Sequence, residues 1–364
     1  MSSLTITIIQ PDLRWEDKEA NLAMLEERIM GIKEKTEVVV LPEMFSTGFS
    51  MRPEVLAERM DGPGVEWMRR VAARRRVVLT GSLIIEEGGN YYNRLIWMLP
   101  NGQMGVYDKR HRFAYAGEDA HYTAGTKRLI ASVKGWRLNL QVCYDLRFPV
   151  WARQAADPII DMPGTRGVSD TGNEGPVLPE TYDLPGRGLG PYVSAAEDPE
   201  VEGAGEADLK GGRGGAPMEG RAGSSGIGPN FGEGQHSGEG QNSRERQNFG
   251  AASNSKIEPP LPEYDILVYV ANWPERRNHA WKTLLQARAI ENQVFVVGVN
   301  RVGNDGNKIY HSGDSMIVDP LGAAIYQAGP REEIFTCTLE RSALEEVRAR
   351  FPFWRDRDRF TIQA

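Results

Sequence analysis

Several short runs of this sequence consist almost entirely of apolar residues, and they constrain the fold more than any other feature. Residues 37–41 (EVVVL) and 294–299 (VFVVGV) lack the alternation of polar and apolar residues that marks a strand with one face in water. Strands of this composition are typical of sheets that are covered on both faces. The sequence also favours strands at 4–10, 77–85, 136–142 and 266–271.

Amphipathic helices alternate with these strands in both halves of the chain. Residues 19–32 place Leu22, Leu25, Ile29 and Ile32 at spacings of three or four, which predicts a helix. Helices are also predicted at 64–75, 280–292 and 342–350, with a hairpin at 91–99 and 105–108 and later strands at 314–318, 323–327 and 334–339. The alternation indicates an α/β fold with layered sheets and helices on the outside.

Residues 156–262 differ in character from the rest of the chain. Gly, Pro, Ser, Glu, Asn and Gln dominate, and about half of the 40 glycines lie there. Without apolar periodicity this stretch buries too little surface to offset the entropy of ordering. We predict a disordered insertion at 156–262 within one domain formed by residues 1–155 and 263–364.

Composition excludes several functional classes. The chain has 43 Lys and Arg against 50 Asp and Glu, a formal net charge of -7, so no basic excess predicts binding to nucleic acid. No apolar run reaches the roughly 20 residues that span a membrane. The two cysteines, Cys143 and Cys337, are too few for a disulfide framework and predict the reducing cytoplasm. Cys337, within a predicted strand, is interpreted as structural.

Cys143 stands where the strand at 136–142 ends and a helix that includes Pro149 is predicted to begin. Unpaired backbone N–H groups at such a junction favour a thiolate, which is the nucleophilic form of cysteine. The alternative for an isolated cysteine is a buried core residue. Glu43 and Lys109 also follow strand-like runs, and functional sites of layered α/β sheets gather at such strand ends. Taken singly, Glu43 would equally suit a helix cap and Lys109 a solvated basic run.

Longer motifs surround these residues and make the pattern more specific. They are LPEMFSTGF around Glu43, YDKRHRF around Lys109, QVCYDLRFPVW around Cys143, and YVANWPERR, LLQARAIENQ and VGVNRVG after residue 262. In these motifs the chain resembles the nitrilase (carbon–nitrogen hydrolase) superfamily, and most closely its omega-amidase branch. The resemblance implies a four-layer αββα sandwich with a Glu–Lys–Cys triad and no metal or organic cofactor. The sequence likewise contains no CxxC pair, no HExxH and no Gly-rich phosphate loop.

The resemblance also assigns roles to residues. Cys143 would be the nucleophile, Glu43 the general base, and Lys109 with the backbone N–H of Tyr144 the oxyanion hole. Glu118, the second glutamate of the family, would orient Lys109. The implied reaction hydrolyses the terminal amide of 2-oxo dicarboxylic acid monoamides (2-oxoglutaramate, 2-oxosuccinamate) through a thioester.

The substrate's carboxylate would be held by an arginine, since a guanidinium binds a carboxylate through two parallel hydrogen bonds. The candidates are Arg147, Arg276 and Arg277, with Trp273 and Phe113 as pocket walls. The alternative for each arginine, and the favoured one for Arg147, is a structural ion pair. Met44, Phe45 and Phe49 are interpreted as core. The resemblance further implies a homodimer, which the insertion would weaken. The alternatives are another carbon–nitrogen hydrolase (an aliphatic amidase, carbamoylase or nitrilase) and a non-catalytic scaffold that uses the insertion.

Overall fold

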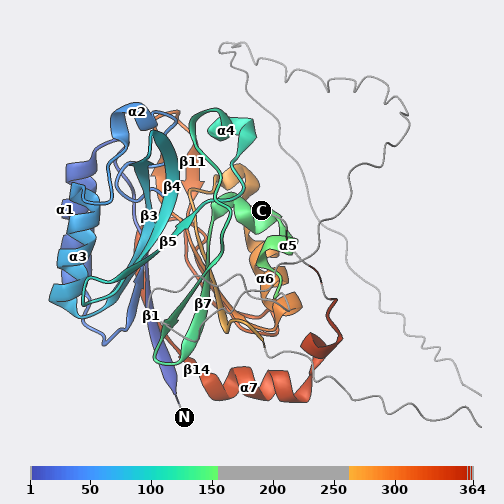
Figure 1. Cartoon of the computed structure of the whole chain (residues 1–364). Coiled ribbons are helices and arrows are strands. Elements are labelled where there is room, and N and C mark those ends of the chain that lie inside the picture. The colour runs from blue at the N-terminus through green and yellow to red at the C-terminus, as the bar shows by residue number, and fades with distance from the viewer. Residues whose placement is uncertain (1, 155–261, 359, 361, 363–364) are drawn as a thin grey trace, which may run out of the picture. The chain divides into compact units, whose positions relative to one another are not determined.

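The computed structural model describes residues 2–154 and 262–358, together with residues 360 and 362. Apart from Pro262, the predicted insertion lies outside these described residues. Two six-stranded sheets face each other, and helices cover the outer face of each (Figure 1). The predicted four-layer αββα sandwich is therefore confirmed. In the described part of the chain, every helix is too short or too polar to cross a membrane.

The first sheet is built around three parallel strands, β1, β2 and β3, and antiparallel strands complete it on both sides. In spatial order its strands are β14 (Glu333–Glu340), β1 (Ser3–Gln10), β2 (Val38–Val40), β3 (Val78–Glu87), β4 (Asn90–Met98) and β5 (Met104–Asp108). The predicted hairpin is β4 and β5, and Gly102 in its turn has φ +83°, a conformation that glycine adopts without strain.

The second sheet has the same plan, with parallel β7, β8 and β9 at its centre. In spatial order its strands are β13 (Ala324–Gln327), β12 (Met316–Val318), β9 (Phe295–Val299), β8 (Ile266–Val270), β7 (Trp136–Val142) and β6 (Leu129–Val133). All residues of β8 and β9 are buried, as their apolar composition predicts. The carboxyl ends of β2, β7 and β8 thereby come to one end of the sandwich.

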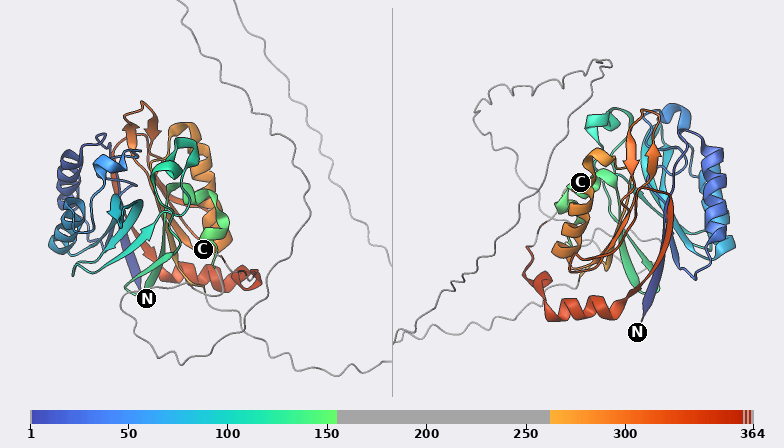
Figure 2. Two further views of the ribbon diagram at one scale, coloured as in Figure 1. Left: turned by 45° about the horizontal axis from the view of Figure 1, so that its top comes forward. Right: turned by 180° about the vertical axis from the view of Figure 1, so that it is seen from behind.

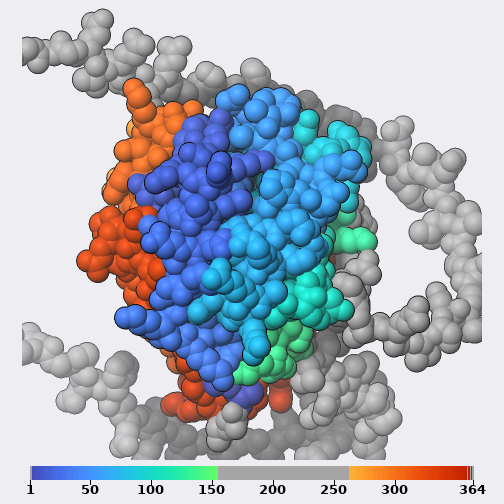
Figure 3. All heavy atoms as spheres, turned by 90° about the vertical axis from the view of Figure 1, so that its left-hand side faces the viewer, coloured from blue at the N-terminus to red at the C-terminus, as the bar shows by residue number. Residues whose placement is uncertain are grey.

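Helices α1 (Lys18–Gly31) and α3 (Pro63–Arg75) cover the first sheet, and α5 (Pro149–Ala152) and α6 (Asn278–Asn292) cover the second (Figures 1 and 2). Figure 3 looks onto the α1 and α3 side, where N-terminal residues form the outer surface. Helix α7 (Arg341–Arg350) crosses the lower end of the sandwich in Figure 1. The remaining elements are α2 (Pro53–Leu56), α4 (Glu118–His121), the hairpin β10 (Val302–Asn304) and β11 (Tyr310–Ser312), and the 3-10 turns η1 (Ala114–Ala116), η2 (Cys143–Arg147), η3 (Glu275–Arg277) and η4 (Phe353–Asp356).

Two apolar clusters hold the layers together. One fills the space between the sheets, and the other packs α1 and α3 onto the outer face of the first sheet through Leu25, Ile29 and Val71, among others. Local signals set the helix ends. The Asp17 carboxylate accepts the N–H of Ala20 at the start of α1, and Pro63 occupies the first turn of α3.

The predicted helices agree with the structure to within two residues at each end. The sequence did not predict β6, β10 and β11, nor the single-turn helices α2 and α4. Elements of three to five residues are too short to show a periodicity, so their pairing is decided by neighbouring strands.

Candidate active site

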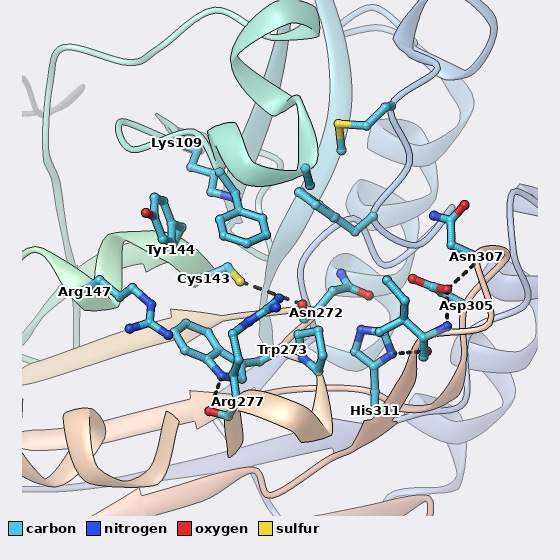
Figure 4. Close-up of a pocket in the computed structure, with 16 residues that line it drawn as sticks. Lys109, Cys143, Tyr144, Arg147, Asn272, Trp273, Arg277, Asp305, Asn307 and His311 are labelled. Carbon is cyan, nitrogen blue, oxygen red and sulfur yellow. Dashed lines mark hydrogen bonds between the residues drawn. The ribbon is translucent and has the colours of Figure 1, made fainter. Parts of the chain in front are cut away.

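A pocket opens at the carboxyl ends of the parallel strands, where the loops after β7 and β8 meet the end of β5 (Figure 4). Lys109, Cys143 and Asn272 are among the polar residues that line it. Aromatic walls come from Phe49, Phe113, Tyr144 and Trp273. Apolar walls lower the local dielectric constant and strengthen the interactions of the charges that they enclose.

Lys109 joins two buried carboxylates. Its Nζ donates to Glu43 Oε1 at 2.9 Å and to both oxygens of Glu118, at 3.0 and 2.8 Å. Exposure of the three side chains is 1% or less. Burial disfavours the charged lysine, but Glu118 and Glu43 outweigh burial and raise the pKa of Lys109 above its ordinary value. Lys109 is therefore a fixed ammonium group.

Neighbouring amides fix both carboxylates. Asn93 Nδ2 donates to Glu43 Oε1 at 2.8 Å, and the backbone N–H of Asn272 donates to Glu43 Oε2 at 2.9 Å. Glu118 accepts the backbone N–H of Phe113. Burial raises the pKa of Glu118, and Glu43 raises it further while Lys109 opposes both. With every oxygen bonded to a donor, the two acids have little freedom to rotate.

Cys143 lies at the sharp turn between β7 and η2. Its φ is +44°, a left-handed conformation that costs a non-glycine residue roughly 1–2 kcal/mol. Its Sγ lies 4.0 Å from the carbonyl oxygen of Asn272, and the charges of Glu43 and Lys109 both act on it. The structure thus brings Glu43, Lys109, Glu118 and Cys143, which are far apart in sequence, into one buried cluster.

The expectation that a helix end favours the Cys143 thiolate is wrong. Burial raises the pKa of Cys143 well above its ordinary value, Glu43 raises it further, and Lys109 only partly offsets them. Cys143 opens the short 3-10 turn η2, and α5 contains only four residues. So short a helix has little dipole to set against the loss of water.

A third buried carboxylate, Asp145, connects the turn at Cys143 to the loop after β5. Its Oδ2 accepts the backbone N–H of Val142 at 3.0 Å and the hydroxyl of Tyr107 at 2.7 Å. Its Oδ1 accepts the backbone N–H of His111 at 3.0 Å and pairs with the ring Nδ1 of His111 at 2.8 Å. Val142 precedes Cys143, and Tyr107 lies two residues before Lys109. By binding both Val142 and Tyr107, Asp145 fixes the distance between Cys143 and Lys109.

The substrate-binding candidates divide into two groups. Tyr144, Arg147, Trp273 and Phe113 line the pocket, and the Arg147 guanidinium lies 5.1 Å from the ring centre of Trp273. Arg276 is exposed and does not line the pocket, whereas its neighbour Arg277 does. Of these two neighbouring candidates only Arg277 lines the pocket, because the turn η3 directs the two side chains differently.

Other residues were missed or misassigned. Met44 and Phe45 are core, as predicted, but Phe49 lines the pocket, and the hairpin β10–β11 contributes Asp305, Asn307, Ile309 and His311. Asn272 follows the predicted strand 266–271 just as Glu43 follows 37–41, so a signal for it was present. No group of three or more His, Cys, Asp or Glu suited to a metal ion occurs among the described residues.

Comparison with known proteins places this site in a family. The model of the carbon-nitrogen hydrolase family matches residues 5–169 and 260–349, which is most of the chain. The chain belongs to the carbon-nitrogen hydrolase family. This carbon-nitrogen hydrolase is 30% identical over 363 residues to the omega-amidase YafV of Escherichia coli (strain K12), and the match covers 100% of both chains. It is 22% identical over 355 residues to a 2-oxoglutaramate amidase of Bacillus subtilis (strain 168), covering 97% of this chain and 96% of the relative.

Among solved structures, the carbon-nitrogen hydrolase superfamily protein XC1258 of Xanthomonas campestris aligns with a TM-score of 0.70. It is 32% identical, covers 100% of both chains and carries an arsenic adduct in its active site. Family and neighbour together confirm two predictions, the nitrilase-type sandwich and an enzyme that hydrolyses carbon–nitrogen bonds.

Proposed function

We propose that this carbon-nitrogen hydrolase cleaves the terminal amide of 2-oxo dicarboxylic acid monoamides, such as 2-oxoglutaramate and 2-oxosuccinamate. The observation that carries the proposal is the buried cluster of Glu43, Lys109 and Glu118 beside Cys143. The identity to omega-amidases supports the choice of substrate.

The first half of the reaction forms a thioester. Because the resting Cys143 is a thiol, Glu43 accepts its proton as Sγ attacks the amide carbon. The carbonyl electrons move to oxygen, and the oxyanion is stabilised by the Lys109 ammonium and the backbone N–H of Tyr144. Glu43 then protonates the amide nitrogen, the C–N bond breaks, and ammonia leaves.

The second half regenerates the enzyme. Glu43 removes a proton from water, which attacks the thioester, and Cys143 leaves with a proton returned by Glu43. The balance is amide plus water giving acid plus ammonia. Glu118 keeps Lys109 in place through its two hydrogen bonds, so the ammonium does not have to reorganise as charge develops on the substrate.

At the other end of the substrate, the Arg147 guanidinium would bind the carboxylate. Its stacking on Trp273 leaves its N–H edges free for a bidentate contact, while Phe113 and Tyr144 pack edge to face at 4.9 Å beside it. We also propose a homodimer, which is supported by apolar side chains in water on α5 and α6, Val150 being 58% and Ile290 55% exposed.

A substrate screen tests the proposed reaction. Steady-state ammonia release is measured with 2-oxoglutaramate, an aliphatic nitrile and an N-carbamoyl amino acid, and we expect 2-oxoglutaramate to have the highest kcat/KM. Cys143→Ala should abolish turnover, and mass spectrometry of the quenched wild type should detect an acyl group on Cys143. Full turnover by Cys143→Ala would exclude the covalent mechanism. Absence of any hydrolysis, together with no labelling of Cys143 by iodoacetamide, would favour the scaffold.

A further inference from the structure

Two guanidinium groups line the pocket without a counter-ion. Arg147 extends from η2 and Arg277 from η3. Within the residues that the structure describes, neither side chain forms an ion pair or a hydrogen bond; each only stacks on an aromatic ring. Arg147 is exposed and Arg277 half-buried, whereas buried arginines such as Arg94 and Arg301 are paired, Arg94 with Asp108 and Arg301 with Asp12.

Arg277 is held in a defined position. Its guanidinium carbon lies 5.0 Å from the ring centre of Phe113, and its backbone carbonyl accepts the indole N–H of Trp273 at 2.8 Å. In Figure 4 its side chain rises from η3 toward Cys143, on the same side of the pocket as Arg147. The residue therefore presents its charge where a substrate bound to Cys143 would extend.

The surroundings of Arg277 disfavour its charge. Burial lowers the pKa of Arg277, and Arg147 and Arg276 lower it further, while Cys143 and Tyr115 oppose them. Asp305 also lines the pocket, but its Oδ1 already accepts the backbone N–H groups of Asn307 and Ile309. A partly buried cation next to a second cation is unfavourable unless an anion arrives to pair with it.

We infer that Arg277 is a second carboxylate-binding residue which, with Arg147, makes a free carboxylate on the substrate obligatory. The inference rests on the proposed function, since it concerns the end of the amide substrate that does not react. One guanidinium can bind a carboxylate through two hydrogen bonds. A second guanidinium therefore supplies additional N–H donors, which can bind an oxo group next to the carboxylate. A neutral aliphatic amide forms no ion pair with either guanidinium, so it binds more weakly than a substrate that carries a carboxylate.

The test compares two substrates of equal length, 2-oxoglutaramate and 4-oxopentanamide, in which a methyl group replaces the carboxylate. For Arg277→Gln we expect kcat/KM on 2-oxoglutaramate to fall about 30-fold or more, mainly through KM, because the ion pair with the substrate carboxylate is lost. On 4-oxopentanamide the same variant should stay within about threefold of wild type, since that substrate has no partner for the guanidinium. Arg277→Lys keeps the positive charge but lacks the planar guanidinium. Its kcat/KM on 2-oxoglutaramate should lie between the values of the wild type and Arg277→Gln.

Arg276→Gln is the matched control, because Arg276 lies on the same turn but outside the pocket, and it should behave as wild type on both substrates. Equal losses by Arg277→Gln on the two substrates would overturn the inference, as would an unchanged KM for 2-oxoglutaramate. Failure of the proposed reaction is detected separately: calorimetry measures the affinity of Cys143→Ala for uncleaved 2-oxoglutaramate with and without Arg277→Gln. Affinity that depends on Arg277 supports the inference even if turnover is absent, and affinity that does not depend on it refutes the inference.

Discussion

Cys143 is placed as a nucleophile but is protonated at rest. Its backbone adopts a left-handed conformation that directs the sulfur into the pocket, while burial and Glu43 keep it protonated. Such a thiol is protected from indiscriminate reaction and becomes a nucleophile only when a base accepts its proton. In this arrangement Glu43 both raises the thiol pKa and is the group positioned to deprotonate it.

These two effects of Glu43 can be separated. Glu43→Gln removes a negative charge that raises the pKa of Cys143, so the thiol pKa should fall and the rate of alkylation by iodoacetamide should reach its plateau at lower pH. Turnover should fall by about 10²-fold or more, since the general base is lost. Glu19→Gln, on the exposed surface of α1, serves as control. If the pH dependence of the alkylation rate were unchanged in Glu43→Gln, or shifted to higher pH, Glu43 would not be what raises the pKa of Cys143.

Asp145 is expected to act as a positioning residue. In the wild type both carboxylate oxygens of Asp145 accept hydrogen bonds from buried donors. In Asp145→Asn an NH₂ group replaces one of these oxygens, which leaves its donors unpaired and lowers the free energy of unfolding by about 1–3 kcal/mol. We expect kcat to fall about tenfold with little change in KM, because the distance between Cys143 and Lys109 is no longer fixed.

Tyr107→Phe removes only one of the hydrogen bonds to Asp145 and should have the smaller effect on kcat. It also removes the acceptor of the Trp151 indole N–H and of the Arg110 backbone N–H, so it should lower stability as well. Both variants are compared at a temperature where circular dichroism shows that they are folded. If Asp145→Asn loses stability but keeps the wild-type kcat, its role is in folding alone.

Among secondary-structure elements, α7 depends on one buried carboxylate. Arg348 donates to Asp265 Oδ1 at 3.0 Å and to the carbonyl oxygen of Tyr264 at 2.8 Å, and Arg137 binds Asp265 from β7. Burial opposes ionisation of Asp265, but Arg137 and Arg348 outweigh burial and hold its pKa below the ordinary value. Helix α7 therefore docks through this ion cluster as well as through Leu344, which is buried in the hydrophobic core.

The pH dependence of stability follows from this lowered pKa. The contribution of Asp265 is fully present above its ordinary pKa and is lost as pH falls through the lower folded value. Asp265→Asn should reduce the free energy of unfolding in urea at pH 7 by about 1–3 kcal/mol. The difference from wild type should shrink toward pH 3. A difference that persists unchanged at low pH would indicate lost packing as the cause.

Element prediction was reliable where a segment was long and periodic. The helices α1, α3, α6 and α7 carry their apolar stripe over several turns, and the strands after which Glu43 and Cys143 stand are apolar enough to be recognised alone. The hairpin β10–β11 is different. Its turn at 304–307 was predicted, but its three-residue strands were not, and neither was its contribution of His311 to the pocket. Burial, with the charge of Arg301, lowers the pKa of His311 to about 4, so it lines the pocket as a neutral ring.

At the scale of the whole molecule, the described residues that flank the 156–262 segment, Gln154 and Glu263, lie next to each other. Gln154 Oε1 accepts the backbone N–H of Glu263 at 2.7 Å, and Arg128 binds both the carbonyl oxygen of Arg153 and the carboxylate of Glu263. Closing a long loop between ends already in contact costs little additional entropy. The sandwich therefore does not need this segment to bring its two halves together.

Deleting residues 156–262 and bridging the ends with a short Gly-Ser linker should leave kcat/KM within about threefold of wild type, since the described pocket residues come from outside the segment. Light scattering of both proteins tests the proposed homodimer, and we expect the deletion to associate at least as tightly. Lost turnover in a deletion that retains the wild-type circular dichroism would show that the segment takes part in the chemistry.

The sequence by itself determined the α/β class, the long helices and the identity of Glu43, Lys109 and Cys143, because periodicity and motifs are local. Tertiary structure decided what depends on distant neighbours: the protonation of Cys143, the choice between Arg276 and Arg277, the brace at Asp145 and the hairpin over the pocket. These properties are set by burial and by charged side chains from distant parts of the chain. The residues adjacent in sequence therefore do not reveal them.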